Sequence, residues 1–317
     1  MPIIDLGYRN WDGERSARFL RPLAITGTSL RLVWRAVWLR RLLMIALLPM
    51  IPVGVCFFMY EQIPEREGLK RAALEISSEL FESNPQLRDA IVSDSPEARH
   101  LVWANLLLGF FRYPQAILMV VLFGLVAPRI ISYDIRSRAY LLYFSRPLTV
   151  LEYLIGKALV LVVLLALTST IPALGVYCLG LAFSPDLWTF FDTWDLPLRI
   201  IAASVTLALP TASLAILYSS FTNESRYAAF AWFTTWGLGW VTYLVLTSSA
   251  LFSNDFTAVP KYVTLVSPYH ALGQIQAAIF GTLADNGEAS GAILLVSVVT
   301  ICSMMIAYQR VAAQLRV

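Results

Sequence analysis

The stretch from Ile131 to Lys157 reads ISYDIRSRAYLLYFSRPLTVLEYLIGK and separates two long apolar runs. Its basic residues, counting the one just before it, are Arg129, Arg136, Arg138, Arg146 and Lys157. Aromatic and aliphatic residues alternate with these charges, among them Tyr140, Leu141 and Phe144. A short segment that is both basic and apolar, and is joined to membrane spans at both ends, docks either on a lipid surface or on a protein partner.

The composition indicates an all-α membrane protein. Of the 317 residues, 58% are hydrophobic and 14% are charged, whereas soluble domains are about a quarter charged. Several apolar runs reach the roughly 20 residues that a helix needs to cross a bilayer core. The alternation that is typical of a membrane barrel is missing. All three cysteines lie within apolar runs, so we expect neither a disulfide framework nor a metal site.

Six transmembrane helices are predicted within a single domain over residues 1–317. Five of them cover Leu42–Tyr60, Ala158–Leu181, Leu198–Phe221, Ala228–Leu251 and Gly291–Tyr308. The second span ends at Ala127 and begins either at Leu101, as one long helix, or near Arg112 after an interfacial segment. Basic residues gather before the first span, in residues 129–157 and after the last span. The positive-inside rule therefore places both termini and residues 129–157 in the cytoplasm, and we expect a multi-pass protein of the cell inner (cytoplasmic) membrane.

Residues 1–41 are expected to form a cytoplasmic N-terminus that contains an interfacial helix. Met1–Thr26 carries several helix breakers and is expected to be irregular. From Thr28 or Ser29 a helical pattern runs to Arg41, with the candidate lipid-interface residues Arg31, Trp34, Arg35 and Trp38. An apolar body with tryptophans and arginines is typical of a helix that lies along the inner leaflet. The alternative is that this pattern is only the basic flank of the first span.

Two segments are expected on the outer side. Residues 61–100 form an acidic loop with two short amphipathic helices broken near Pro85. This loop either binds an extracytoplasmic partner or is a solvated cap. Residues 252–290 contain an apolar piece, Val263–Leu283, that is interrupted by Pro268 and His270. These interruptions favour short re-entrant helices over a further span.

Arg112 interrupts the second predicted span. Either it lies at depth, where an ionisable residue is a functional candidate, or its side chain reaches the outer interface. In the fifth span, Trp232, Trp236 and Trp240 recur every four residues and form one aromatic face. We expect this face to serve packing or lipid contact rather than ligand binding.

The sequence contains no catalytic motif. It lacks the G-x-x-x-x-G-K-[ST] loop that cradles nucleotide phosphates, and it lacks the H-E-x-x-H and G-x-S-x-G signatures. Apart from Arg112, the span interiors are nearly free of charge, which argues against a proton-coupled carrier. We therefore expect no catalytic residue, no cofactor and no nucleic-acid partner for this chain, and any energy source has to be a partner protein.

The pattern Asp134-x3-Arg138-Ala139-x-Leu141-Leu142-x2-Ser145-x-Pro147-Leu148-Thr149, closed by Gly156–Lys157, resembles the ABC-2 type transporter permeases. Residues 218–228 (YSSFTNESRYA) are similar to the family's turn between spans four and five. Residues 266–283 (VSPYHALGQIQAAIFGTL) are similar to its Ser-Pro segment before the last span, as in the gliding-motility and nitrous-oxide-reductase maturation permeases. Arg138 stands where the family has glycine, and Val150 where it has arginine. We therefore expect a continuous helix across Arg138.

This resemblance implies an exporter subunit that pairs with a second permease copy or paralogue and with separate P-loop ATPase subunits. Those subunits would bind ATP and Mg, and residues 129–157 would form the coupling helix that contacts them. The implied contact residues are Asp134, Arg136, Arg138, Tyr140, Leu141, Phe144, Arg146 and Pro147. Asp134 and Arg138 lie four residues apart and are expected to pair. The nearly uncharged spans favour an amphipathic or lipid-like cargo.

Two other functions fit the same sequence. The first is a secondary transporter or channel that needs no ATPase. The second is a scaffold that anchors an ATPase, or an outer partner at residues 61–100, without transporting anything.

Overall fold

Six apolar helical runs dominate the computed structural model, which describes residues 20–63, 68, 75, 84–93, 95–139, 148–186, 188–252, 262–283 and 286–314. The described residues form helices joined by turns, without any strand among them. The candidate membrane spans are Val37–Gln62, Pro96–Arg136, Val150–Phe183, Leu196–Phe221, Ser225–Ser248 and Ala289–Ala313. Each contains most of one predicted span, so the helical membrane class and the six spans are confirmed.

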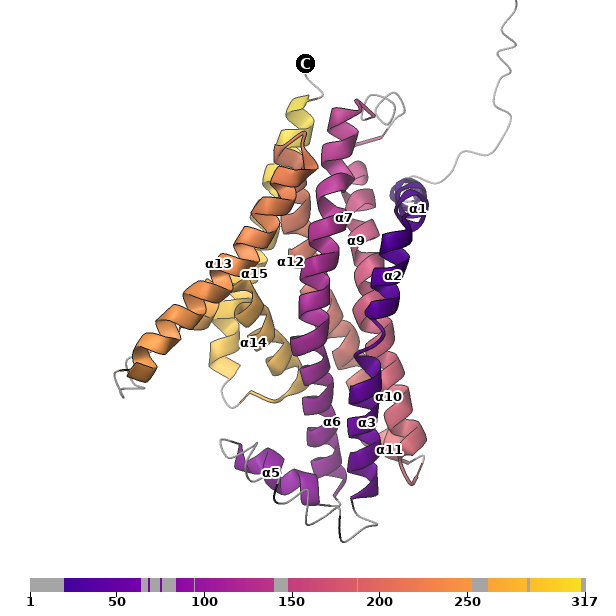
Figure 1. The fold of residues 1–317 in the computed structure, drawn as a ribbon, viewed down its shortest axis with the longest axis vertical. Helices are drawn as coiled ribbons and strands as arrows, with labels where there is room; N and C mark the ends of the chain where they lie inside the picture. The colour runs from indigo at the N-terminus through magenta and orange to yellow at the C-terminus, as the bar shows by residue number, and fades with distance from the viewer. Residues whose placement is uncertain are drawn as a thin grey trace, which may run out of the picture.

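The first three runs are each interrupted. The first run consists of α2 (Val37–Ile45) and α3 (Met50–Gln62). The second consists of α6 (Pro96–Phe110), the π-helix η2 (Phe111–Gln115) and α7 (Ala116–Arg136). The third consists of α9 (Val150–Leu165), the π-helix η3 (Ala166–Thr170) and α10 (Ile171–Phe183). The other three are the continuous helices α12 (Leu196–Phe221), α13 (Ser225–Phe252) and α15 (Asn286–Gln314). Figure 1 shows α7 and α9 side by side, with α13 diverging from them.

Five shorter helices complete the described fold. These are α1 (Arg21–Trp34), α5 (Pro85–Val92), α11 (Thr189–Asp192), the 3-10 helix η5 (Val263–Val266) and α14 (Pro268–Phe280). In Figure 1, α1 lies at one end of the bundle and α5 at the other, while α14 lies between them. The predicted helix after Pro85 is confirmed as α5, because Asn84 accepts a hydrogen bond from the Leu87 N–H and Pro85 takes the first turn. The predicted helix before Pro85 lies mostly outside the described residues.

Two predictions for the N-terminal region are wrong. The first helix begins at Arg21 rather than at Thr28 or Ser29, with Pro22 in its first turn, a position that suits proline's fixed φ. The pattern up to Arg41 is also not one helix, because Ala36 is extended (ψ 115°) and separates α1 from α2. The chain turns there because α1 packs against α9, whereas α2 begins the first span.

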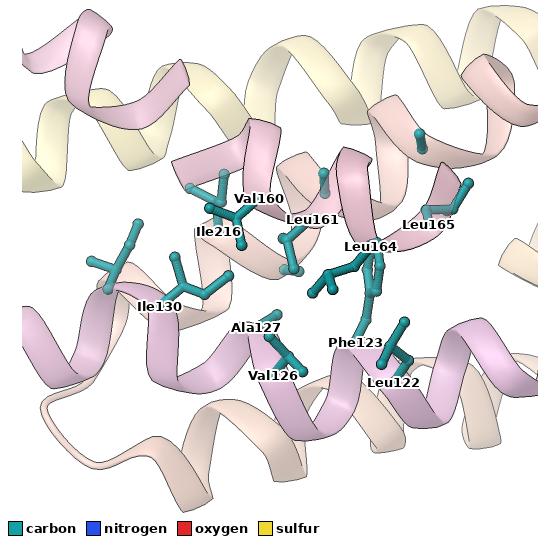
Figure 2. Packing of buried hydrophobic residues seen from close by; sticks show 14 of the residues in the cluster. Leu122, Phe123, Val126, Ala127, Ile130, Val160, Leu161, Leu164, Leu165 and Ile216 are labelled. Carbon is teal, nitrogen blue, oxygen red and sulfur yellow. The ribbon is translucent and has the colours of Figure 1, made fainter. Parts of the chain in front are cut away.

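Buried apolar side chains form two main clusters. The larger one joins α7, α9, the second half of α12, α13 and α15, and Figure 2 shows part of it, with Phe123 and Ala127 of α7 facing Leu161 and Leu164 of α9. The second one joins α3, α6, α10 and the first half of α12. Because lipid is as apolar as these side chains, the clusters stabilise the bundle through close packing more than through the hydrophobic effect.

The division between the clusters coincides with the three helix interruptions. The chain loses α-helical geometry between Ala46 and Pro49, in η2 and in η3, and η2 contacts η3 directly. Gln115 of η2 donates from Nε2 to the Ala46 carbonyl over 3.3 Å, so it satisfies one backbone group that the first interruption exposes. The three irregular segments therefore lie together between two separately packed halves.

Candidate functional site

The segment expected to contact a partner lies partly outside the described residues. Tyr140, Leu141, Phe144, Arg146 and Pro147 all lie outside the described part, and their contact role stays a prediction. The helices on either side are described, with α7 ending at Arg136 and α9 beginning at Val150. What the structure adds is how these two ends are held.

Asp134 and Lys157 form a buried ion pair between the two helices. The Lys157 Nζ lies 2.7 Å from the Asp134 Oδ2, and Tyr153 donates its hydroxyl to the same oxygen over 2.8 Å. Only 7% of Asp134 and 4% of Lys157 are exposed. The expected pairing of Asp134 with Arg138 is therefore wrong. Asp134 is a positioning residue that joins α7 to α9, because its carboxylate faces the interior of the bundle.

The N-terminal helix α1 joins the same cluster. Lys157 donates to the Ser29 hydroxyl over 3.3 Å, and Thr26 donates to the Gly156 carbonyl over 2.9 Å. A Cβ on Gly156 would lie 2.9 Å from both the Ile25 Cβ and the Pro22 carbonyl oxygen. The Gly156–Lys157 pair thus has two separate tasks: the glycine lets α1 approach α9, and the lysine pairs with Asp134. Sequence reasoning missed Ser29, Tyr153 and this task of Lys157.

The end of α7 has the geometry of a Schellman cap. Arg138 adopts φ 55°, the Ala139 N–H donates to the Asp134 carbonyl over 2.9 Å, and the Arg138 N–H donates to the Ile135 carbonyl over 3.2 Å. The prediction of a continuous helix across Arg138 is therefore wrong. An arginine here adopts the left-handed conformation that glycine takes without strain, and this conformation ends the helix.

The start of α9 is capped as firmly. Thr149 accepts a hydrogen bond from the Glu152 N–H over 3.2 Å, and Glu152 accepts one from the Thr149 N–H over 2.8 Å. This capping box satisfies two backbone donors and explains why the helix begins at Val150, eight residues before the predicted span at Ala158. Residues 140–147 therefore connect two capped helix ends that an ion pair holds together.

Arg136 lies on the surface beside this connection. Its side chain is 66% exposed, and its Nη1 lies 3.5 Å from the Glu224 Oε1 in the turn between α12 and α13. Below it, the Ser219 hydroxyl of α12 accepts from the Ile131 and Ser132 N–H groups over 3.1 and 3.0 Å. Those contacts fix α7 against α12, so the end of the helix that carries the exposed Arg136 and precedes Arg138 is held in place.

The candidate lipid-interface residues flank the break between α1 and α2. Trp34 and Trp38 are 45% and 37% exposed, and Arg31 and Arg35 are exposed as well. The Arg129 guanidinium lies 6.0 Å from the centre of the Trp38 ring. Their exposure fits contact with headgroups, but an interfacial location stays a prediction.

Arg112 binds α14. Its Nη1 donates to the Tyr269 carbonyl over 2.8 Å, its guanidinium lies 4.3 Å from the centre of the Tyr269 ring, and the Tyr269 hydroxyl donates to the Arg112 carbonyl over 2.8 Å. A Cβ on Gly273 would overlap the guanidinium. The side chain is thus directed at the protein interior, and its depth in a bilayer stays a prediction.

A polar cluster also joins helices at the opposite end of the bundle. The Asp195 carboxylate lies 2.9 Å from the His100 Nε2 and 2.6 Å from the Arg199 Nε, and Arg199 Nη1 donates to the Ile279 carbonyl over 2.9 Å. Burial raises the pKa of Asp195, but the hydrogen bond and charge of His100 and the charge of Arg199 outweigh it and lower this pKa. The cluster connects α6, α12 and α14.

The fold and these contacts define a multi-pass α-helical membrane protein with an internally braced connection between its second and third spans. No protein-family model matches the chain, and no curated protein matches it either.

Proposed function

We propose that this protein is the membrane subunit of an ABC-2 type exporter and that residues 129–157 contact a separate P-loop ATPase. The carrying observation is the Asp134–Lys157 pair, which joins both ends of the connecting segment to the second and third spans. A force applied to residues 140–147 reaches both spans, because α7 and α9 cannot separate without leaving two buried charges unpaired. This mechanical continuity is what an external motor needs.

The surface beside the segment suits a protein partner. Arg136 and Arg138 are exposed next to it, and arginine and aromatic residues are the usual anchors of protein interfaces. The sequence has no phosphate-binding loop of its own, so ATP and Mg would be bound by the partner subunits. A second permease copy would complete the exporter, whose cargo we expect to be amphipathic or lipid-like.

The test is to purify the tagged chain from its native membrane and identify any P-loop ATPase that elutes with it. We expect an eluate that hydrolyses Mg-ATP, and we expect the double charge reversal Arg136→Glu/Arg138→Glu to lose both the subunit and the hydrolysis. The matched control is Arg40→Glu, which changes an exposed arginine on α2 and should retain them.

The rival functions predict other outcomes. A secondary transporter or channel elutes without an ATPase and moves its substrate without ATP. A scaffold retains the ATPase but moves nothing into liposomes. An ATPase that still binds the double charge-reversal variant would contradict the assigned contact residues.

A further inference from the structure

Helix α1 lies across the bundle at the level where two spans begin. Figure 1 looks nearly along the axis of α1, whereas α7 and α9 run lengthwise through the same view. The Thr26 hydroxyl donates to the carbonyl of Gly156 over 2.9 Å, just before the apolar run that starts at Ala158. The candidate span Val37–Gln62 follows shortly after α1 ends at Trp34. A helix placed in this way runs parallel to a bilayer surface.

One face of α1 is covered by protein and the rest is not. The buried residues Ile25, Thr26 and Ser29 face α9. Large apolar side chains outside that face are exposed, and the exposure continues onto the first turn of α2. These side chains are Leu23, Leu32, Trp34, Val37 and Trp38. A helix in the plane of a leaflet buries such side chains at the boundary between headgroups and acyl chains.

Exposed arginines surround these apolar side chains. They are Arg31 and Arg35 at the end of α1, Arg41 of α2, and Arg129 of α7. Arg41 lies one turn after Trp38 on the same face of α2, and the Arg129 guanidinium lies 6.0 Å from the centre of the Trp38 ring. Both arginines therefore border the surface that Trp38 belongs to.

This surface is positive and is not neutralised by the described part of the chain. None of the four arginines forms an ion pair with a residue that the structure describes. The sequence has no aspartate or glutamate from residue 15 to residue 60. A partner with negative charge would complement it.

A lipid leaflet complements this surface better than a water-soluble protein does. The arginines alternate with exposed apolar side chains beside the start of a span, where phosphate headgroups and acyl chains meet. An acidic protein would complement the arginines but would leave the leucines and tryptophans without an apolar partner. Clusters of roughly four to eight basic residues beside a transmembrane helix are typical of anionic-lipid recognition.

We propose that Arg31, Arg35, Arg41 and Arg129 form a binding surface for the headgroups of anionic phospholipids, in the leaflet where α1 lies. Guanidinium groups donate to phosphate oxygens in charge-assisted hydrogen bonds, and the exposed leucines and tryptophans lie among the upper acyl chains. On its covered face, α1 accepts a hydrogen bond from Lys157. Lipid that holds α1 in place therefore also supports the joint between α7 and α9. This surface does not depend on the proposed ATPase contact.

The test counts the lipids bound to the full-length chain in detergent by native mass spectrometry. Phosphatidylglycerol and phosphatidylcholine with the same acyl chains are titrated in separate arms. We expect phosphatidylglycerol to bind about thirtyfold more tightly or better, because each basic residue adds to the attraction. Phosphatidylglycerol should also raise the melting temperature of the chain more than phosphatidylcholine does, since a ligand of the folded state stabilises it.

Two double variants locate the surface. Arg31→Gln/Arg35→Gln removes two charges from the end of α1, and Arg41→Gln/Arg129→Gln removes two from α2 and α7. Each should weaken the binding of phosphatidylglycerol about tenfold and leave that of phosphatidylcholine unchanged. The second variant serves if the first fails to fold.

The matched control removes two charges that already face carboxylates. Arg88→Gln/Arg226→Gln changes two exposed arginines, which lie beside Asp89 and Glu224, and it should keep the preference for phosphatidylglycerol.

Three results would overturn the proposal. These are equal binding of the two lipids, an unchanged preference in both arginine variants, and an equal loss in the control. An ATPase that elutes with the unmodified chain and is lost from either arginine variant, while phosphatidylglycerol still binds as before, would assign this surface to a protein partner instead.

Discussion

The Asp134 carboxylate and the Lys157 ammonium group lie 2.7 Å apart inside the bundle, although 22 residues separate them along the chain and the expected partner of Asp134 was Arg138. This ion pair holds the end of the second span against the start of the third, on either side of the connecting residues 140–147.

The ion pair can be tested by removing one charge. Asp134→Asn leaves Lys157 as an unpaired buried charge, so we expect it to destabilise the chain by about 3–5 kcal/mol. The double variant Asp134→Asn/Lys157→Met should recover a large part of that loss, because no unpaired charge remains. Unfolding of the purified chain in detergent measures both changes.

As a control, Arg88→Ala breaks the exposed Arg88–Asp89 pair and should cost under about 1 kcal/mol. A similar loss in both single variants would contradict the burial of the Asp134–Lys157 pair.

The contact between α1 and α9 depends on Gly156. Gly156→Ala would press a methyl group on Ile25 and Pro22, and we expect it to cost about 1–3 kcal/mol by overpacking. Gly27→Ala is the matched control on α1, since no atom lies within 4 Å of its added Cβ. That variant should be neutral or stabilise by up to about 1 kcal/mol through helix propensity. Equal melting temperatures for the two variants would exclude the close approach at Gly156.

Arg138 adopts a conformation that an L-residue holds at a cost. We expect Arg138→Gly to raise the stability of the isolated chain by about 0.5–1 kcal/mol, because glycine takes φ 55° without a Cβ clash. Arg136→Gly, two residues earlier in the last turn of α7, should instead lower it by about 1 kcal/mol. Thermal melting distinguishes the two. If Arg138→Gly were as destabilising as Arg136→Gly, α7 would continue as a helix through Arg138.

The anchoring of α14 depends on the space that Gly273 leaves for Arg112. Gly273→Ala places a methyl group where the guanidinium lies, so we expect a loss of about 1–3 kcal/mol. The loss should shrink when the same change is made in Arg112→Ala, because the clash is then gone. Gly237→Ala on α13 meets nothing within 4 Å and is the control. Equal losses with and without Arg112 would show that the two residues do not touch.

The cluster around Asp195 predicts a dependence on pH. Because His100 and Arg199 lower the pKa of Asp195 in the folded chain, its contribution to stability is present above its ordinary pKa of about 3.9 and is lost as pH falls through the lowered value. We expect the melting temperature to drop below about pH 4, and Asp195→Asn to reduce that drop. The exposed Asp192 provides the control Asp192→Asn, which should keep it. An unchanged pH profile in Asp195→Asn would refute this assignment.

Local patterns were enough to predict the spans and the start of α5. Hydropathy and length are properties of consecutive residues, so each observed span contains most of one predicted span. The predicted break near Pro85 likewise depends only on its own turn, where the structure adds the Asn84 cap. Even there, helix ends such as Arg21 and Val150 differed from expectation, because caps and packing on α9 extend helices beyond the apolar runs.

The sequence by itself determined that the chain is a bundle of six apolar helices with its charges at their ends, because burial in lipid selects for composition over 20 or so consecutive residues. Only the tertiary structure decided that Asp134 faces Lys157 and that Arg112 holds α14. These pairings join residues far apart in the chain, and they depend on how helices cross and where they are interrupted. No local pattern carries that information.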